Sequence, residues 1–533
     1  MAAGTDRLNS FQRFRRRARR LIGGLALSLA ACTAASTWSN AHATTDFAAD
    51  AHRQLIAPLV QGDEPIVVSE HTVQTVDGPL TYEAQIGRLA IRRGDNGEVH
   101  GYIFFVAYRV RPKSGVPRPI TFAWNGGPGV PSSIVHLGGI GPRMMVGGRL
   151  KDSPETLLRT TDLVFMDAME TGFSRPARER YAPEFFTLRG DVAATAEFIR
   201  AFRTRLRATD QPVFIAGESY GVFRAAALSD FMVDRGDRLD GTILISGDFP
   251  NVPQPIAFYD AMHIPARTAT AFYYKRLPPD LMRNRAATMK AVVNWAINVY
   301  QPALEHLETL SDAQKNQIIA QLARYTGMKP EDFSRKTLVM HANKFLTNFM
   351  GSDGDNPLSE EDTRELQAKE NLKGSPQALD RYLRDELGYD TDLSYSWIED
   401  GYRPEPGPKL RTAGGQFDYD LPIPSDDWAA TVKAGEVTWI ARDNPPWMPN
   451  ALRRDKKLRV FVATGRFDPL NMCEGDVRVT AQLPPDERAR VENHCYESGH
   501  VIYLDPAARH QILGDLSRFI SKTLAAGKAT AKP

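Results

Sequence analysis

Short apolar runs recur along the sequence, and segments with helical periodicity lie between several of them. The run VFIAG (213–217) follows DVAATAEFIRAFRTRLR (191–207), whose apolar residues stand at helical spacing. Apolar strands that alternate with helices are typical of a parallel sheet covered on both faces. The predicted fold class is therefore α/β, with a largely parallel central sheet. The other expected strands are ITFAW (120–124), DLVFMD (162–167), TILISG (242–247) and LRVFVAT (458–464).

Two regions depart from this alternation. Segments separated by D-G and N-G turns between about 71 and 110 predict antiparallel strands. From about 255 to 425 helical patterns dominate, and we interpret this stretch as a helical cap inserted into the sheet domain. The predicted organisation is an export signal over 1–43, the core over 44–254 and 426–533, and the cap over 255–425. The last residues, AAGKATAKP, are expected to form a frayed tail.

The N-terminus has the pattern of an export signal, because basic FQRFRRRARR precedes the apolar LIGGLALSLAACTAAS. Two processing sites compete: AHA (41–43) would leave Thr44 as the first residue, whereas LAAC (29–32) would place a lipid anchor on Cys32. An uncleaved anchor is disfavoured because the apolar run is short. We expect an exported protein, periplasmic or secreted, without a membrane span in the mature chain. The net charge of +2 provides no general attraction to nucleic acid.

GESYG (217–221) has the spacing of a nucleophile elbow around Ser219. G-x-S-x-G alone is weak evidence, since about 0.1–0.2 chance matches are expected in a chain this long. Its context is stronger, because a buried strand precedes the motif and a helical pattern follows it. A sharp strand-to-helix turn exposes the serine hydroxyl above the sheet. The alternative is an ordinary tight turn that uses glycine for packing.

A nucleophilic serine needs a base and an acid that orients the base. Asp468 follows the strand LRVFVAT, and His500 lies in a loop before VIYLD, which is expected to form a short strand. The order Ser219, Asp468, His500 is the one found in α/β hydrolases. The rival residues are His494 in a polar loop, His510 in a helix, Asp476 and Asp505.

WNGGPG (124–129) follows the strand ITFAW and presents backbone N–H groups without side-chain bulk. With the N–H of Tyr220, this loop could supply the two donors that an oxyanion hole needs. The alternative is a glycine- and proline-rich loop without a chemical role.

Taken in order, WNGGPG, GESYG, GRFD and SGH resemble the serine carboxypeptidase family related to carboxypeptidase Y. The bacterial branch of that family is also similar in HLGGIGPR (136–143), VHGYIFFVAY (99–108) and SGHVIYLD (498–505). The resemblance extends from about residue 68 to 520 and is weakest in the cap. Together these motifs are specific, although each alone is not.

The resemblance implies an α/β-hydrolase core with a helical cap, and removal of C-terminal amino acids from peptides or proteins without a cofactor or metal. It implies that Ser219 is the nucleophile, His500 the base and Asp468 its orienting acid. It also assigns Gly127 and Tyr220 to the oxyanion hole, and Asn125, Gly126 and Glu218 to the carboxylate of the substrate.

The chain departs from the family pattern in the loop after NGGPG, at Gly139, and in DAMETGFS (167–174), where Met169 and Glu170 replace the usual proline and glycine. Val130 follows NGGPG where the family commonly has a cysteine, so its usual disulfides are largely absent. Cys473 and Cys495 remain as a candidate disulfide of an exported protein, and the lack of C-x-x-C argues against structural zinc. Gly139 stands where family members carry a second glutamate, so no carboxyl partner for Glu218 is expected at this position.

Two other functions stay open on the same scaffold. A serine esterase or acyltransferase would share the catalytic residues and differ in how it recognises the substrate. A non-catalytic binding protein would lack a member of the triad, and none is missing here. P-loop, H-E-x-x-H and strand-linked G-x-G-x-x-G motifs are absent, so phosphate, zinc and dinucleotide chemistry find no support.

Overall fold

The computed structural model describes residues 53–112, 116–249, 254–351, 357–367, 376–396 and 446–530. The chain divides into two compact units, Met1–Ala51 and His52–Pro533, and all that follows concerns the second. The predicted export signal, Cys32 and Thr44 lie outside the described residues. Among the helices of the described part, none is long and apolar enough to cross a membrane.

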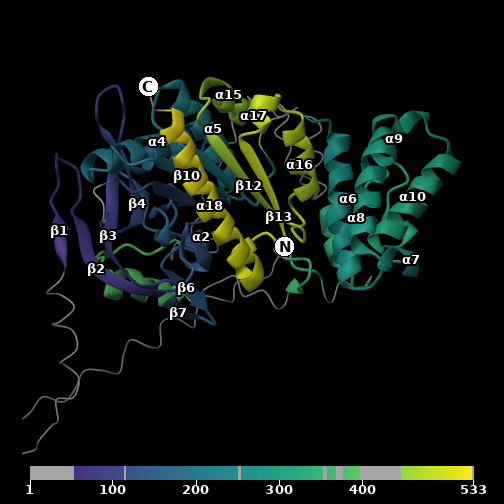
Figure 1. The fold of residues 1–533 in the computed structure, drawn as a ribbon, viewed down its shortest axis with the longest axis horizontal. Coiled ribbons are helices and arrows are strands. Elements are labelled where there is room, and N and C mark those ends of the chain that lie inside the picture. Colours follow the sequence, from purple (N-terminus) through teal and green to yellow (C-terminus); the bar gives the residue numbers. More distant parts are fainter. Residues whose placement is uncertain are drawn as a thin grey trace, which may run out of the picture. The chain divides into compact units, whose positions relative to one another are not determined.

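A large mixed sheet runs through the second unit (Figure 1). One end is antiparallel, and six parallel strands make up the rest, which confirms the predicted fold class. In spatial order the strands are β1 (Gln54–Ile56), β2 (Ile66–Thr75), β3 (Gly78–Arg92), β4 (Val99–Arg109), β8 (Asp162–Met166), β5 (Ile120–Trp124), β10 (Val213–Glu218), β11 (Gly241–Ile245), β12 (Arg459–Gly465) and β13 (Val491–Tyr496). β9 (Arg175–Pro176) pairs with β4, and β6 (Arg143–Val146) forms a separate hairpin with β7 (Arg149–Asp152).

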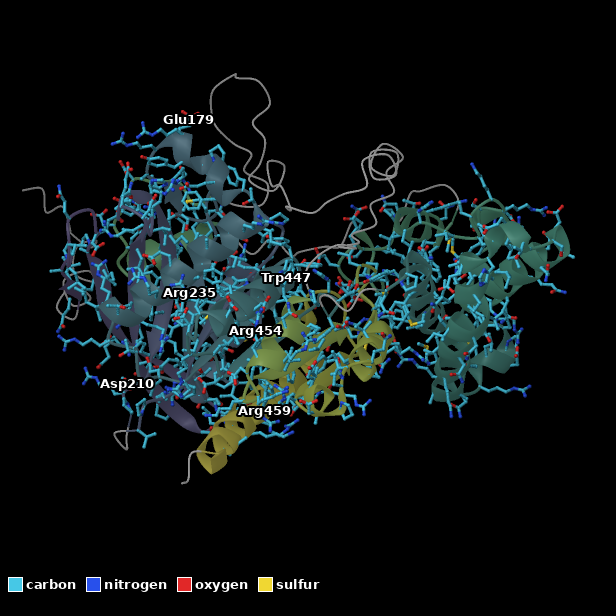
Figure 2. All side chains as sticks on the ribbon, turned by 90° about the horizontal axis from the view of Figure 1, so that it is seen from above. Glu179, Asp210, Arg235, Trp447, Arg454 and Arg459 are labelled. Atoms are coloured by element: carbon cyan, nitrogen blue, oxygen red, sulfur yellow. A yellow bond between two sulfur atoms is a disulfide. The ribbon has the colours of Figure 1, made fainter. Side chains whose placement is uncertain are left out.

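Alternate residues of the parallel strands face two hydrophobic cores, because successive side chains of a strand point to opposite faces. In β5, Phe122 and Trp124 join one core, and Ala123 joins the other. The helices α4 (Leu188–Arg205), α5 (Gly221–Asp234) and α15 (Trp447–Arg454) pack on the first core. Figure 2 labels Trp447 and Arg454, which bound α15, and Arg454 forms an ion pair with Asp230 of α5.

The last helix, α18 (Pro506–Thr530), covers the opposite face of the sheet (Figure 1). The ring of Phe519 lies 6.2 Å from that of Phe214 in β10 and 5.4 Å from that of Phe461 in β12. The parallel strands are thus buried on both faces, which explains why their sequences are almost wholly apolar.

Between β11 and β12 the chain forms a group of helices. This group contacts the core where its helix α6 packs against α16 (Figure 1). The helices of this stretch are α6 (Ile256–Tyr273), α7 (Pro279–Met282), α8 (Arg285–Trp295), η4 (Ala296–Tyr300), α9 (Gln301–Glu305), α10 (Asp312–Thr326) and α11 (Ala342–Asn348); α16 (Cys473–Ala481) follows β12. Residues 397–425 of the predicted cap lie outside the described residues. α12 (Pro376–Arg381) and η8 (Tyr382–Glu386) pack instead on the sheet, where the hydroxyl of Tyr382 lies 2.8 Å from that of Tyr108.

The remaining elements are short, and three segments differ from the sequence prediction. The short elements are α2 (Ser133–Val135), η1 (His136–Ile140), η2 (Leu157–Arg159), η3 (Glu179–Tyr181), α3 (Ala182–Phe185), η5 (Leu307–Thr309), η6 (Pro330–Asp332), α17 (Pro485–Arg488) and η9 (Ile502–Leu504). The polar segment around His494 is strand β13 rather than a loop. At the edge of the described sheet this strand pairs with β12 alone and stays half-exposed, so polar residues are tolerated there. VIYLD forms the turn η9 rather than a strand, and AAGKAT belongs to α18 rather than to a frayed tail.

Candidate active site

Ser219 lies in a sharp turn between β10 and α5. Its φ of 59° is in the left-handed region, a strained conformation for a residue with a side chain. The turn is tight, since a Cβ on Gly217 would collide with the carbonyl oxygen of Gly221. The Ser219 N–H donates to Ile245 O at 2.9 Å, which ties the turn to the end of β11. This is the geometry that a nucleophile elbow requires.

The loop after β5 packs directly against this elbow. A Cβ on Gly126 would collide with the backbone nitrogen of Tyr220, so only glycine permits the approach. Gly127 has a φ of 103°, and within the described part of the chain its N–H donates to no protein acceptor. The loop and the first turn of α5 therefore bring the candidate oxyanion donors, Gly127 and Tyr220, into one region.

Asp468 and His500 follow the neighbouring strands β12 and β13 and form a buried pair. Asp468 Oδ2 lies 2.8 Å from His500 Nδ1, and Asn471 Nδ2 donates to the same oxygen at 2.7 Å. Asp468 is fully buried and His500 is 6% exposed. The hydroxyl of Ser246, the residue after β11, donates to the carbonyl of His500. Since Ile245 O accepts from Ser219 and Ser246 donates to His500, the end of β11 links the candidate nucleophile to the candidate base.

The Ser219 hydroxyl is not hydrogen-bonded to the His500 ring in this structure, whereas the His500–Asp468 contact is formed. In unliganded sites the hydrogen bond between nucleophile and base is often long and tightens when the substrate binds. The contact with Asp468 thus orients the His500 ring through Nδ1, so that Nε2 is the ring atom that could accept a proton.

The rival residues have other roles in the structure. His510 is exposed and pairs with Glu155, and His494 stacks on Phe461 with the ring centroids 4.5 Å apart. The carboxylate of Asp476 accepts bonds from Phe249 N and Thr464 Oγ1, both at 2.6 Å. Asp505 accepts from the N–H groups of Ala507 and Ala508 at the start of α18. Of the candidates considered, His500 and Asp468 alone form a buried pair beside the elbow.

Glu218, the residue before the nucleophile, is 2% exposed. Asn125 Nδ2 donates to its Oε1 at 2.9 Å, whereas its Oε2 is buried with no hydrogen-bond partner among the described residues. Burial raises the pKa of Glu218 to about 8; the charge of His500 lowers this pKa, and the nearby Glu361 carboxyl raises it further. A neutral carboxyl group that can donate a hydrogen bond thus lies beside Ser219.

Glu361 is a site residue that the sequence analysis missed. Its backbone carbonyl accepts a hydrogen bond from the backbone N–H of His500 at 2.5 Å. Its carboxyl interacts electrostatically with both Glu218 and His500. Residues 361 and 362 press against Gly499, where a Cβ would meet the Cβ of Asp362 at 2.5 Å. No motif marks Glu361, which lies in the region where the family resemblance is weakest.

Gly139 has no side chain, so it cannot supply the second carboxyl group that family members carry at this position, as the sequence predicts. A Cβ at this position would lie 2.7 Å from the Cβ of Tyr503. Any larger side chain would displace the segment that follows His500. A carboxyl partner for Glu218 is therefore absent at Gly139, and Glu361 brings one from another part of the chain.

The pKa of His500 is raised to about 9, although burial alone would lower it. The Asp468 carboxylate at 2.8 Å is the main cause of the increase, and Glu361 and Glu218 add to it. His500 and Glu218 therefore do not titrate independently, because a proton on either one changes the affinity of the other.

A buried ion pair lies next to the loop after β5, which carries the candidate oxyanion donor Gly127. Arg224 of α5 is 1% exposed and donates from Nε to Asp191 Oδ2 of α4 at 2.7 Å. Its Nη1 donates to the carbonyl of Asn125 at 3.1 Å, and the Tyr220 hydroxyl donates to the same oxygen of Asp191 at 3.2 Å. This arrangement joins the elbow helix to the loop that carries Asn125 and Gly127.

Cys473 at the start of α16 and Cys495 in β13 form a disulfide, with their Cα atoms 5.7 Å apart. Together with Glu474, the two cysteines are close enough to hold a metal ion. The disulfide occupies both sulfur atoms, however, so this group offers a single carboxylate and is a poor metal site.

One family model matches part of the chain. Residues 77–244, which include the oxyanion loop and the elbow, match the family model of serine carboxypeptidases. This match confirms the resemblance that the motifs indicated. No curated protein sequence matches the chain.

Solved structures give weaker likenesses. A prohormone-processing carboxypeptidase from Saccharomyces cerevisiae aligns at 14% identity and a TM-score of 0.45, over 83% of this chain and 92% of that one. A proline iminopeptidase from Mycobacterium smegmatis aligns at 12% identity and a TM-score of 0.32, over 86% of this chain and 100% of that one. An esterase from Thermogutta terrifontis aligns at 11% identity and a TM-score of 0.33, over 82% and 99%. With TM-scores below 0.5, these likenesses carry no inference about function.

Proposed function

We propose that this chain, whose residues 77–244 match the serine carboxypeptidase family, is a serine-type carboxypeptidase that releases C-terminal amino acids through an acyl-enzyme on Ser219. One observation carries the assignment to a free C-terminus: the carboxyl of Glu218 is buried beside the nucleophile, with one oxygen bonded to Asn125 and the other without a partner among the described residues. A neutral carboxyl group in this position can donate a hydrogen bond to a carboxylate.

In the acylation step, Ser219 Oγ attacks the scissile carbonyl carbon while His500 Nε2 takes the hydroxyl proton. Asp468 accepts a hydrogen bond from His500 Nδ1 and stabilises the imidazolium that forms. The N–H groups of Gly127 and Tyr220 donate to the oxyanion. One such donor contributes about 3–4 kcal/mol to stabilisation of the transition state.

The tetrahedral intermediate collapses when His500 gives its proton to the nitrogen of the leaving amino acid. The bond between the carbonyl carbon and that nitrogen breaks, and the ester on Ser219 remains. His500 then takes a proton from water, and the resulting hydroxide attacks the ester carbon. The bond between that carbon and Ser219 Oγ breaks, and His500 returns the proton to Oγ. The products are a free amino acid and a peptide shorter by one residue.

The terminal carboxylate of the substrate is held by Glu218, Asn125 and Gly126. Glu218 donates through its protonated Oε2, and Asn125 donates its second Nδ2 hydrogen, since the first goes to Glu218. The side-chain oxygen of Asn125 accepts from Val135 N at 2.9 Å, which fixes the amide so that its NH₂ group faces Glu218. The Gly126 N–H is the third donor.

Catalysis requires neutral His500 and protonated Glu218 at the same time. The form with a proton on Glu218 and none on His500 has the same net charge as the form with the proton moved to His500. Binding of a substrate carboxylate favours the first form, because a charged Glu218 would repel it. Peptide binding thereby favours neutral His500, the form that can take the proton of Ser219 Oγ.

Peptide and protein C-termini outside the cytoplasm are the proposed substrates. The export pattern at the N-terminus supports a periplasmic or secreted enzyme, with lipid attachment at Cys32 as the alternative to cleavage before Thr44. The helices from α6 to α11 form the proposed cap over the site.

The test compares one peptide with a free C-terminus and the same peptide with an amidated C-terminus. Mass spectrometry of the free peptide should show a ladder of products that lose one C-terminal residue at a time, and the amidated peptide should be stable. Ser219→Ala should abolish turnover, and retained activity in that variant would exclude the mechanism. Inert peptides together with rapid hydrolysis of a simple ester would favour an esterase.

A further inference from the structure

An open groove of about 620 Å³ lies between the cap helix α8 and the loops that carry Asp468 and His500. Its walls come from α8, from α16, and from Arg466 and Glu497, which stand two and three residues from Asp468 and His500. Its volume is in the range of peptide and ligand sites. The groove therefore adjoins the loops that follow β12 and β13, which carry Asp468 and His500, and borders the proposed cap.

The groove carries an excess of positive charge. Its charged lining residues are the four bases Arg285, Lys290, Arg466 and Arg478 and the two acids Glu474 and Glu497. Glu497 pairs with Arg285 at 2.7 Å and with Arg466 at 3.1 Å, and Arg466 also contacts Glu474. Within the described ranges, no carboxylate forms an ion pair with Lys290 or Arg478. Two of the four cations are thus available to a ligand.

A carboxypeptidase needs an open surface for the part of the peptide that precedes the cleaved bond. The C-terminal residue of the substrate enters a closed site, where Glu218 and Asn125 are buried. The rest of the peptide lies on the acyl side of the scissile bond and must leave through an open path. The groove is such a path, because it is open to solvent and adjoins the loops of Asp468 and His500.

We propose that this groove binds substrate residues on the N-terminal side of the scissile bond and favours acidic side chains there. The proposal rests on the proposed carboxypeptidase function and adds a substrate class to it. Lys290 is exposed and Arg478 is half-buried, so both can meet a peptide without disruption of an existing ion pair. Charge complementarity of this kind acts mainly on specificity and on the rate of association.

The expected effect is modest and depends on salt. An exposed ion pair changes an affinity by roughly two- to fivefold. Three acidic residues in place of three basic ones should therefore raise kcat/KM by on the order of tenfold at low ionic strength. The preference should shrink at about 1 M salt, where charges more than about 3 Å apart are screened.

The test uses three peptides with the same two C-terminal residues and with glutamate, glutamine or lysine at the three preceding positions. For the wild-type protein, kcat/KM should fall in that order. The charge reversal Lys290→Glu with Arg478→Glu should invert the order, while hydrolysis of the glutamine peptide stays within about twofold. Lys457→Glu is the matched control, since Lys457 is exposed at the opposite end of β12 and should leave the order unchanged.

Two results would overturn the proposal, and they are distinguishable from each other. Equal kcat/KM for the three peptides, or an order that the double reversal does not change, would refute the groove assignment while the carboxypeptidase function stands. Failure of the wild-type protein to shorten any of the peptides would refute both.

Discussion

Asn125 Nδ2 donates a hydrogen bond to Glu218 Oε1 at 2.9 Å, and this contact joins the loop after β5 to the residue before Ser219. The bond leaves the other carboxyl oxygen of Glu218 buried and without a partner among the described residues. A carboxyl in this state is most stable with its proton, since burial raises its pKa to about 8. The pair thus presents hydrogen-bond donors at a place where a substrate carboxylate can bind.

Glu218→Gln should remove the loss of peptide binding at alkaline pH. In the wild-type protein, Glu218 is neutral below its pKa of about 8 and becomes a buried anion above it, so KM for peptides should rise as the pH passes that value. Glutamine stays neutral and can still donate to a carboxylate. Steady-state kinetics between pH 5 and about 10 measure this. An equal alkaline rise in KM in both proteins would contradict the role of Glu218.

Glu361→Gln should shift the acidic limb of the kcat profile to lower pH. The Glu361 carboxyl helps to raise the pKa of His500, and the neutral amide removes that contribution, so His500 becomes an active base at lower pH. The backbone bond from His500 N to Glu361 O does not depend on the side chain. Glu360→Gln is the matched control, because Glu360 is exposed and adjacent. Identical profiles for the two variants would show that Glu361 does not influence the base.

Arg224→Met should lower both stability and turnover, and a second substitution separates the two effects. Loss of Arg224 leaves Asp191 as a buried unpaired charge, which should reduce the free energy of unfolding by about 3–5 kcal/mol. Asp191→Asn in the same chain should restore most of that stability. The carbonyl of Asn125 still lacks its bond from Arg224, so kcat should stay at least about tenfold low.

Urea denaturation and steady-state kinetics on the Arg224 variants measure the two effects. Recovery of kcat together with stability in the double variant would show that Arg224 is only structural. A persistent loss of kcat with little change in KM would identify it as a positioning residue for the oxyanion loop.

Replacement of Cys473 and Cys495 by alanine should lower the free energy of unfolding by about 3 kcal/mol. The two residues are 22 positions apart, and a cross-link over a loop of this length restricts the unfolded chain by about that amount. The midpoint of urea denaturation, with and without a thiol reductant, measures the effect on the wild-type protein. A midpoint that reductant does not change would contradict a stabilising disulfide.

Local sequence patterns predicted the strands of the sheet closely because the physical rules behind them are local. A wholly apolar run such as 213–217 can only be buried on both faces, and it became β10. The polar run around His494 misled the prediction, because an edge strand with one partner tolerates polar side chains. VIYLD was predicted to be a strand but forms a turn, because consecutive apolar residues also occur in a buried turn before a helix.

The α/β order and the candidate residues that follow the ends of the parallel strands could be predicted from local sequence patterns. These residues come together because the carboxyl ends of parallel strands share one edge of the sheet. The acid near Glu218 depends on tertiary packing, since Tyr503 excludes a side chain at Gly139 and the loop over Gly499 brings Glu361 instead. Tertiary packing alone also paired Arg224 with Asp191 and placed α8 opposite α16, because contacts between distant segments leave no periodic trace in the sequence.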